Sequence, residues 1–260
     1  MKNVIKIFFL IFLFSIFLTK SYSAGEKQEL LKVDWSFKGF FGKFDRGSLQ
    51  RGYQVYTEVC ASCHSMKYLS YRNLAEEGGP EFTEEQAKAI ASNFEVKDGP
   101  NSDGEMFTRT AKLSDKFIMP YSNIEEAKVS NGGAYPPDMS VLVKARSGGA
   151  DYIYSVLLGY EDPPEGMILD DGVYYNKYMY GNKIKMPKQL YEDLVTYNDG
   201  TPATPEQMAK DVVTFMAWSA EPHLEARHKI GFRALIYLFI ITILVYFSMK
   251  KIWSRIESEV

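Results

Sequence analysis

The residues best suited to chemistry in this chain of 260 stand together at Cys60-Ala61-Ser62-Cys63-His64, where both cysteines and one of three histidines form a C-x-x-C-H motif. This spacing is typical of covalent haem c attachment. Two thiols three positions apart at a helix start can form thioether bonds to the two vinyl groups of one porphyrin, and the adjacent imidazole can bind the iron. The motif therefore predicts one covalently bound haem c held by Cys60, Cys63 and His64.

Two other uses of the motif fit less well. A dithiol redox pair needs a strand before an open, reactive thiol at a helix N-terminus, whereas residues 52–59 have a helical pattern. A zinc site needs a fourth ligand and usually a second pair of ligands. The remaining histidines, His223 and His228, lie far along the chain beside an apolar segment.

The second axial ligand would decide whether the iron transfers electrons or binds a substrate. A methionine thioether raises the reduction potential and closes the iron to small ligands. Met119 and Met186 are each followed by proline, which holds the preceding residue in an extended conformation. Met186 is better placed, shortly before the last helix of the domain, but local sequence does not choose between the two. His223 and His228 are weaker alternatives.

Helices are the elements expected to position these residues. Apolar spacing and caps predict helices at residues 46–59, 83–93, 123–129, 138–146 and 151–160, and a long ordered loop at 161–181. In the second helix, Thr83 and Gln86 can form a capping box.

The last helix before the C-terminal apolar segment has the clearest start. Thr204 is a cap, Pro205 occupies the first helical position, and Gln207 can complete the cap. Small c-type cytochromes pack a first helix against a last helix across the haem. The expected contact places Gly52, Tyr53 and Tyr56 opposite Phe215 and Trp218.

Two apolar segments frame the chain. Residues 1–23 have a basic start, a short apolar core and small residues at the end, which predicts a cleaved export signal; an uncleaved anchor is the alternative. Residues 229–249 are long and apolar enough to cross a bilayer. The numbers of basic residues on the two sides of this segment are equal, so flanking charge does not fix its orientation in the membrane. The export signal decides that orientation instead. Residues 24–228 are then expected outside the cytoplasm, and residues 250–260 form a cytoplasmic tail.

The expected exported domain is acidic. Residues 25–222 contain 21 Lys and Arg against 30 Asp and Glu, a net charge of −9. A basic protein partner met by electrostatic steering fits this charge, and nucleic acid does not. The alternative interpretation is that this net charge only keeps the domain soluble and marks no binding partner.

The ordered motifs along the chain resemble those of the cytochrome c1 family, the haem subunit of the cytochrome bc1 complex (ubiquinol:cytochrome c reductase). The resemblance covers essentially the whole mature length. It lies in residues 51–56, 60–66, 71–74, 131–138, 145–152, 159–160, 186–187, 199–204 and 218–222, and in the C-terminal anchor.

This resemblance implies a mainly α, class I cytochrome c-like haem domain with long loop insertions, plus one C-terminal transmembrane helix. It implies that His64 and Met186 ligate the iron, that Arg146 and Tyr152 hold a haem propionate, and that Asn131, Pro136 and Pro137 line the pocket. Some bacterial relatives have an additional cysteine pair bracing the pocket. This chain has no cysteine to spare, so rigidity around Met186 is expected from packing alone.

The function implied by the resemblance is electron relay rather than bond chemistry, so the chain is not expected to be an enzyme alone. Electrons would come from the Rieske iron-sulfur protein and leave to a cytochrome c, beside cytochrome b in a bacterial inner or equivalent membrane, with the haem domain on the periplasmic side. A stand-alone membrane-anchored monohaem cytochrome c serving a terminal oxidase is the alternative. A haem peroxidase or gas sensor would need an open iron.

Overall fold

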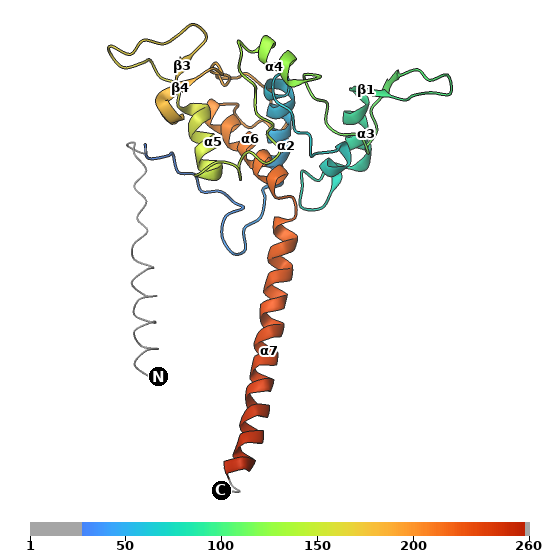
Figure 1. Ribbon diagram of the computed structural model, residues 1–260, viewed down its shortest axis with the longest axis vertical. Coiled ribbons are helices and arrows are strands. Elements are labelled where there is room, and N and C mark those ends of the chain that lie inside the picture. Colours follow the sequence, from blue (N-terminus) through green and yellow to red (C-terminus); the bar gives the residue numbers. More distant parts are fainter. Residues whose placement is uncertain (1–27, 258–260) are drawn as a thin grey trace, which may run out of the picture.

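A domain of helices and loops stands on one end of a long single helix (Figure 1). The computed structural model describes residues 28–257, so the predicted export signal of residues 1–23 lies outside the described residues. The helices are α2 (Arg46–Val55), α3 (Glu84–Ser92), α4 (Ile124–Ser130), α5 (Gly149–Leu158), α6 (Pro205–Ala220) and α7 (Leu224–Glu257). A π-turn, η1 (Tyr56–Cys60), and two 3₁₀ turns, η2 (Tyr71–Ala75) and η3 (Tyr180–Asn182), accompany them.

Strands are few in the part of the chain that the structure describes. The strand β1 (Glu95–Asp98) pairs antiparallel with β2 (Phe107–Thr110). The shorter β3 (Tyr174–Tyr175) pairs antiparallel with β4 (Lys183–Ile184) inside the predicted long loop region. Helices therefore supply most of the regular structure, as the sequence predicts.

The centre of the domain is the crossing of α2 and α6, which α5 also joins. At the crossing point, a Cβ on Gly52 would lie only 2.1 Å from the carbonyl oxygen of Asp211. The rings of Tyr53 and Tyr56 lie 5.7 and 6.0 Å from the ring of Phe215. The predicted contact of the first helix with Phe215 is confirmed. Glycine is required here because the two backbones approach too closely for any side chain.

Three predicted helix starts are confirmed. Thr83 and Gln86 form a reciprocal capping box at α3. The side chain of Asn123 caps α4 and that of Thr204 caps α6, where each accepts a backbone N–H bond. Gln207 differs from the prediction, because its amide donates to the buried Asp211 carboxylate at 2.9 Å.

The helix predicted at residues 138–146 is wrong, because this segment is a series of turns. The Asp138 carboxylate accepts hydrogen bonds from Ser65 Oγ at 2.8 Å and from the Ser140 backbone at 3.0 Å. The backbone N–H of Met139 also donates to the Ser65 carbonyl at 2.8 Å. These bonds tie the segment to the residues after the C-x-x-C-H motif, in competition with a helical ladder. The next helix, α5, lies two residues earlier than predicted and ends before Gly159.

The C-x-x-C-H motif lies at the end of a helix, so its prediction at a helix start is wrong. The α2 helix continues into the π-turn η1, in which the Ala61 N–H donates to the Tyr56 carbonyl at 2.8 Å. The N–H groups of Cys63 and His64 then both donate to the Cys60 carbonyl. This tight turn brings the two cysteines and His64 to one side of the chain. Such π-turns are frequent at functional sites.

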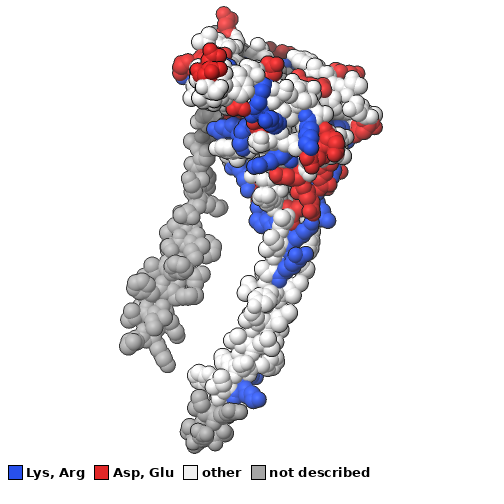
Figure 2. Space-filling view, turned by 90° about the vertical axis from the view of Figure 1, so that its right-hand side faces the viewer, with Lys and Arg blue, Asp and Glu red and all other residues white. Residues whose placement is uncertain are grey.

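The C-terminal helix α7 extends beyond the predicted segment 229–249 at both ends. It contains one candidate membrane span, Leu224–Ser254, in which an 18-residue window has a mean hydropathy of 2.2 and no residue buried against the domain. Figure 2 shows an uncharged middle of the helix with Lys and Arg side chains toward both ends. By length and composition, α7 is able to cross a bilayer.

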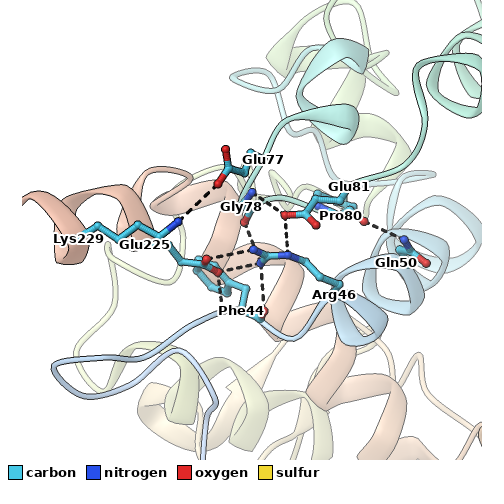
Figure 3. A network of polar contacts seen from close by, with 9 residues as sticks. All are labelled: Phe44, Arg46, Gln50, Glu77, Gly78, Pro80, Glu81, Glu225 and Lys229. Carbon is cyan, nitrogen blue, oxygen red and sulfur yellow. Dashed lines mark hydrogen bonds and ion pairs between the residues drawn. The ribbon is translucent and has the colours of Figure 1, made fainter.

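A polar network joins α7 to the domain (Figure 3). The Glu225 carboxylate accepts two hydrogen bonds from Arg46, at 2.8 and 3.0 Å, and one from the Phe44 backbone N–H at 3.0 Å. Arg46 also pairs with Glu81 at 2.8 Å. Because the half-buried Arg46 and the buried Glu225 are bonded in a bidentate way, the network fixes the first turn of α7 against the domain.

Candidate functional site

A cavity of about 600 Å³ opens in the domain, within the size range of cofactor sites. It lies among η1 and the turn after it, the loop that follows α4, the helices α5 and α6, and the loop around β4. The nine residues that the motif and the family resemblance assign to the site all line it: Cys60, Cys63, His64, Asn131, Pro136, Pro137, Arg146, Tyr152 and Met186.

Cys60 and Cys63 line one side of this cavity and form no disulfide. Burial, with a smaller effect of the neighbouring Cys63, raises the pKa of Cys60 to about 12. A reactive dithiol needs a lowered thiol pKa in an electropositive setting. The surroundings of Cys60 therefore argue against a thioredoxin-like redox pair and suit a sulfur that becomes a neutral thioether.

His64 is held in one orientation by its backbone neighbours. Its Nδ1 lies 2.8 Å from the carbonyl oxygen of Pro137, which leaves Nε2 free to bind a metal. Burial lowers the pKa of His64, although the Pro137 hydrogen bond and the charge of Asp138 oppose this effect. The neutral imidazole is the form that ligates a metal, and a carbonyl bonded to the second nitrogen is the usual way to orient it.

Met186 also lines the cavity, whereas Met119 is 55% exposed and does not line it. The Tyr160 hydroxyl donates to the Met186 carbonyl at 2.9 Å. The neighbouring Lys185 donates to the carbonyl of Gly132 at 2.8 Å, which joins the two loops at this wall. The expectation that packing alone holds the Met186 segment is wrong, since side-chain hydrogen bonds hold it as well.

The three polar candidates line the same cavity. Arg146 is exposed at the rim, and its guanidinium donates to the Ala145 carbonyl at 3.1 Å. The Tyr152 hydroxyl contacts Met179 Sδ at 3.3 Å. The Asn131 amide donates to the Ala127 carbonyl at 2.6 Å and thereby closes the end of α4. Arg146, Tyr152 and Lys185 are cavity-lining side chains that could meet an anionic group.

Sequence reasoning missed much of the apolar wall. Ile153, Val156 and Leu157 give the helix predicted at residues 151–160 its apolar spacing, and they line the cavity from α5. Further lining residues come from the loops and from α6: Met139, Met179, Leu190, Val212 and Met216. Helical spacing in α5 was the available signal, but periodicity shows that a face is buried without showing what it is buried against.

The remaining two histidines lie away from this cavity. His223 lines a separate cavity of about 270 Å³ at the start of α7. His228 Nδ1 lies 3.3 Å from the carbonyl oxygen of Gly42. Both histidines belong to the junction of the domain with α7, and neither faces the C-x-x-C-H motif.

Comparisons with known proteins agree with the residues at this site. The model of the family described as "Cytochrome C1 family" matches residues 35–256. "Cytochrome b/c1" of Bradyrhizobium diazoefficiens is 49% identical over 85% of this chain and 35% of its own length, so the chain spans about a third of that relative. "Cytochrome c1 1, heme protein, mitochondrial" of Arabidopsis thaliana is 48% identical over 86% of this chain and 72% of its own length.

The name of one fungal relative also states the complex to which that relative belongs. "Cytochrome b-c1 complex catalytic subunit, mitochondrial" of Candida albicans is 46% identical over 87% of this chain and 78% of its own length. Together with the family match over most of the chain, these similarities show that the chain belongs to the cytochrome c1 family.

Proposed function

We propose that the cavity of about 600 Å³ holds one haem c, to which Cys60 and Cys63 would attach covalently and whose iron His64 and Met186 would bind. The observation that carries the proposal is the convergence of these four residues on one cavity, although 126 positions separate Cys60 from Met186. The fit is chemical as well as spatial: two unpaired sulfurs, one imidazole with a free Nε2 and one thioether surround a mainly apolar space. The relatives named as heme proteins support it.

The chain's own residues would orient the group and keep water from it. The Pro137 carbonyl holds the His64 ring at 2.8 Å. Pro136, Pro137 and the apolar face of α5 make a stiff, dry wall. Arg146 and Tyr152 would bind a propionate, as the family resemblance implies, and the Tyr152 hydroxyl would then exchange its contact with Met179 for a carboxylate oxygen.

We also propose a class I cytochrome c-like fold with long loop insertions. The crossing of α2 and α6, with the motif directly after α2 and the Met186 loop before α6, supports this assignment. The insertions would be the β1–β2 hairpin region and the loops around α4 and β3.

The function that this site supports best is electron relay in a cytochrome bc1 complex. Haem c supplies a one-electron iron couple when bound. The chain would take electrons from the Rieske iron-sulfur protein, pass them to a cytochrome c, and assemble with cytochrome b; the fungal relative's name supports that assembly. The protein contributes orientation, potential tuning and a docking surface, so it is a redox subunit and no enzyme by itself.

Location follows from the two apolar segments. The export signal of residues 1–23 would place residues 24–228 on the periplasmic side of a bacterial inner or equivalent membrane. Residues 229–249 would be the anchor, and residues 250–260 the cytoplasmic tail. The candidate span within α7 supports the anchor.

The decisive test is to isolate the protein from membranes, identify its companions and ask whether ubiquinol reduces its haem in an inhibitor-sensitive way. Copurification of cytochrome b with inhibitor-sensitive reduction is expected. Purification without cytochrome b would instead favour a stand-alone cytochrome c serving a terminal oxidase.

The Met186→Leu variant tests the proposed ligand. We expect a lower reduction potential and carbon monoxide binding to the ferrous haem, because the iron would lose the thioether that keeps small ligands from it. The matched control is Met119→Leu, at the exposed methionine outside the cavity, which should keep the parent spectrum. An unchanged spectrum in Met186→Leu would return the choice to Met119.

A further inference from the structure

Residues 36–43 form a closed loop, called the aromatic loop below, that carries Phe40 and Phe41 at its tip. Backbone hydrogen bonds of 2.9 Å across its base and 3.2 Å across its tip close it. Gly39 has a φ of +89°, and a Cβ on Gly42 would lie 2.3 Å from a backbone oxygen of the same loop. The tight turn at the tip therefore depends on glycine at both of its ends.

The tip presents its two phenylalanines outward. Phe40 is 56% exposed and Phe41 is 70% exposed, whereas the loop's other aromatic neighbours, Phe37 and Phe44, are 9% and 4% exposed. The aromatic side chains at the base of the loop are therefore buried in the core, whereas those at the tip are exposed. Two adjacent exposed aromatic rings on a constrained turn indicate a contact made outside the domain.

The base of the loop is fixed to two helices. Trp35 Nε1 donates to Asp151 Oδ1 at 2.6 Å, and Lys38 Nζ donates to Asp151 Oδ2 at 3.0 Å, both on α5. After the loop, the Phe44 backbone N–H donates to Glu225 on α7 (Figure 3). The direction in which the tip points is therefore set by the domain and by the first turn of α7 together.

The tip lies where α7 enters its apolar segment. The ring centroids of Phe40 and Phe41 are 6.3 and 5.8 Å from that of Phe232. Phe232 directly precedes Arg233, after which the helix has no charged residue until Lys250. Figure 1 shows the loop hanging from the domain beside the upper end of α7.

We propose that the aromatic loop is a second membrane contact, in which Phe40 and Phe41 insert into the boundary between lipid headgroups and acyl chains. Their rings continue the exposed apolar surface of α7, and Phe is one of the side chains that amphipathic segments bury at this depth. Lys43 on the loop and Arg233 on α7 place cations where lipid phosphates would lie, while Lys38 and Lys229 pair with Asp151 and Glu77.

Two points of contact restrict the domain more than one helix can. A single transmembrane helix leaves rotation about its own axis and tilt open to the domain above it. The aromatic loop lies to one side of that axis and would select the face of the domain that turns toward the membrane. The cavity and its rim would then keep one orientation to the bilayer.

Spin labels report the depth of the tip directly. We would attach a nitroxide to Phe41→Cys in the full-length protein in its native membranes, and compare it with Tyr180→Cys, whose native side chain is 93% exposed. Collision with dissolved oxygen and loss of collision with an aqueous nickel chelate are expected at position 41, with the reverse at position 180. Nickel access at position 41, or protection from both reagents by a neighbouring protein, would overturn the proposal.

A double variant tests the consequence. Phe40→Ser with Phe41→Ser should broaden the distribution of orientations of a nitroxide at Val129→Cys in oriented multilayers, because the domain loses its second contact. Ile168→Ser removes another strongly exposed apolar side chain, 85% exposed, and should leave the distribution unchanged. Equal orientation widths in the double variant and its parent would contradict a membrane contact at this loop. Both readouts are independent of the haem.

Discussion

The Tyr160 hydroxyl donates a 2.9 Å hydrogen bond to the carbonyl oxygen of Met186. Tyr160 follows α5 and Met186 follows β4, so this bond ties the Met186 loop to the end of a helix that lines the same cavity. Burial raises the pKa of Tyr160 far above its usual range, so the hydroxyl stays a donor. Some bacterial relatives brace this pocket with a cysteine pair. This chain has none to spare, and the hydrogen bond between Tyr160 and Met186 holds the Met186 loop instead.

Tyr160→Phe should loosen this brace while keeping the ring. A lost hydrogen bond of this kind costs about 1 kcal/mol of unfolding free energy, plus the cost of a carbonyl left without a partner. If Met186 is the iron ligand, the potential should fall slightly and carbon monoxide should bind faster than in the parent. Redox titration and flash photolysis measure both effects, and Tyr180→Phe on the exposed neighbouring turn should change neither.

Gly52→Ala should damage the crossing of α2 and α6. The new Cβ would lie 2.1 Å from the Asp211 carbonyl oxygen and 2.8 Å from Phe215 Cβ, so the helices must move apart. Overpacking of this kind costs about 1–3 kcal/mol. Gly47→Ala in the same helix is the control, since its Cβ would meet side-chain atoms alone, Arg51 Nη1 at 3.2 Å and Asp45 Oδ1 at 3.4 Å, and no backbone. Thermal unfolding should separate the two variants, and equal stability would contradict the close crossing.

Arg51→Leu should destabilise the domain strongly. Asp211 has no exposed side-chain surface and accepts bonds from Arg51 at 2.9 and 3.2 Å. Removing the cation leaves a buried carboxylate supported mainly by Gln207, at a cost of about 3 kcal/mol in unfolding free energy. Lys128→Leu breaks an exposed pair with Glu125 and should cost less than about 0.5 kcal/mol. Chemical denaturation of both variants measures the difference.

Acid should weaken the segment around Asp115. Hydrogen bonds from Arg109 and from the Lys112 backbone lower the pKa of Asp115 from 3.8 to about 2. Because the folded pKa is below the unfolded one, the stabilisation is complete above about pH 4 and is lost as the pH falls toward 2. Asp115→Asn should flatten the dependence of unfolding free energy on pH in this window. An unchanged slope would show that Asp115 does not contribute to acid unfolding.

Salt should slow electron transfer to a basic acceptor. The domain of residues 25–222 has a net charge of −9, and steering by such a charge is screened at higher ionic strength. Stopped-flow reduction of a basic cytochrome c should therefore slow as salt increases, while reduction of a neutral small-molecule acceptor keeps its rate. A rate for the basic acceptor that is independent of salt would exclude steering.

Local chemistry is what the sequence alone determined. Three features depend only on residues close together in the chain, so they can be identified without knowing the fold. They are the C-x-x-C-H spacing, the capping residues Thr83 and Thr204, and the uncharged segment of α7. The contact of Gly52 with α6 was predictable because the order of helices in small c-type cytochromes constrains which two must cross.

Tertiary structure decided what depends on distant parts of the chain. It placed Met186 on the cavity wall and Met119 on the surface, although both precede proline. It turned residues 138–146 into turns, because the Asp138 carboxylate binds the segment after the haem motif in preference to its own helix. It also brought Phe40 and Phe41 beside Phe232, almost two hundred positions away. Each outcome depends on which surfaces the folded chain brings together, and short-range propensities carry no information about that.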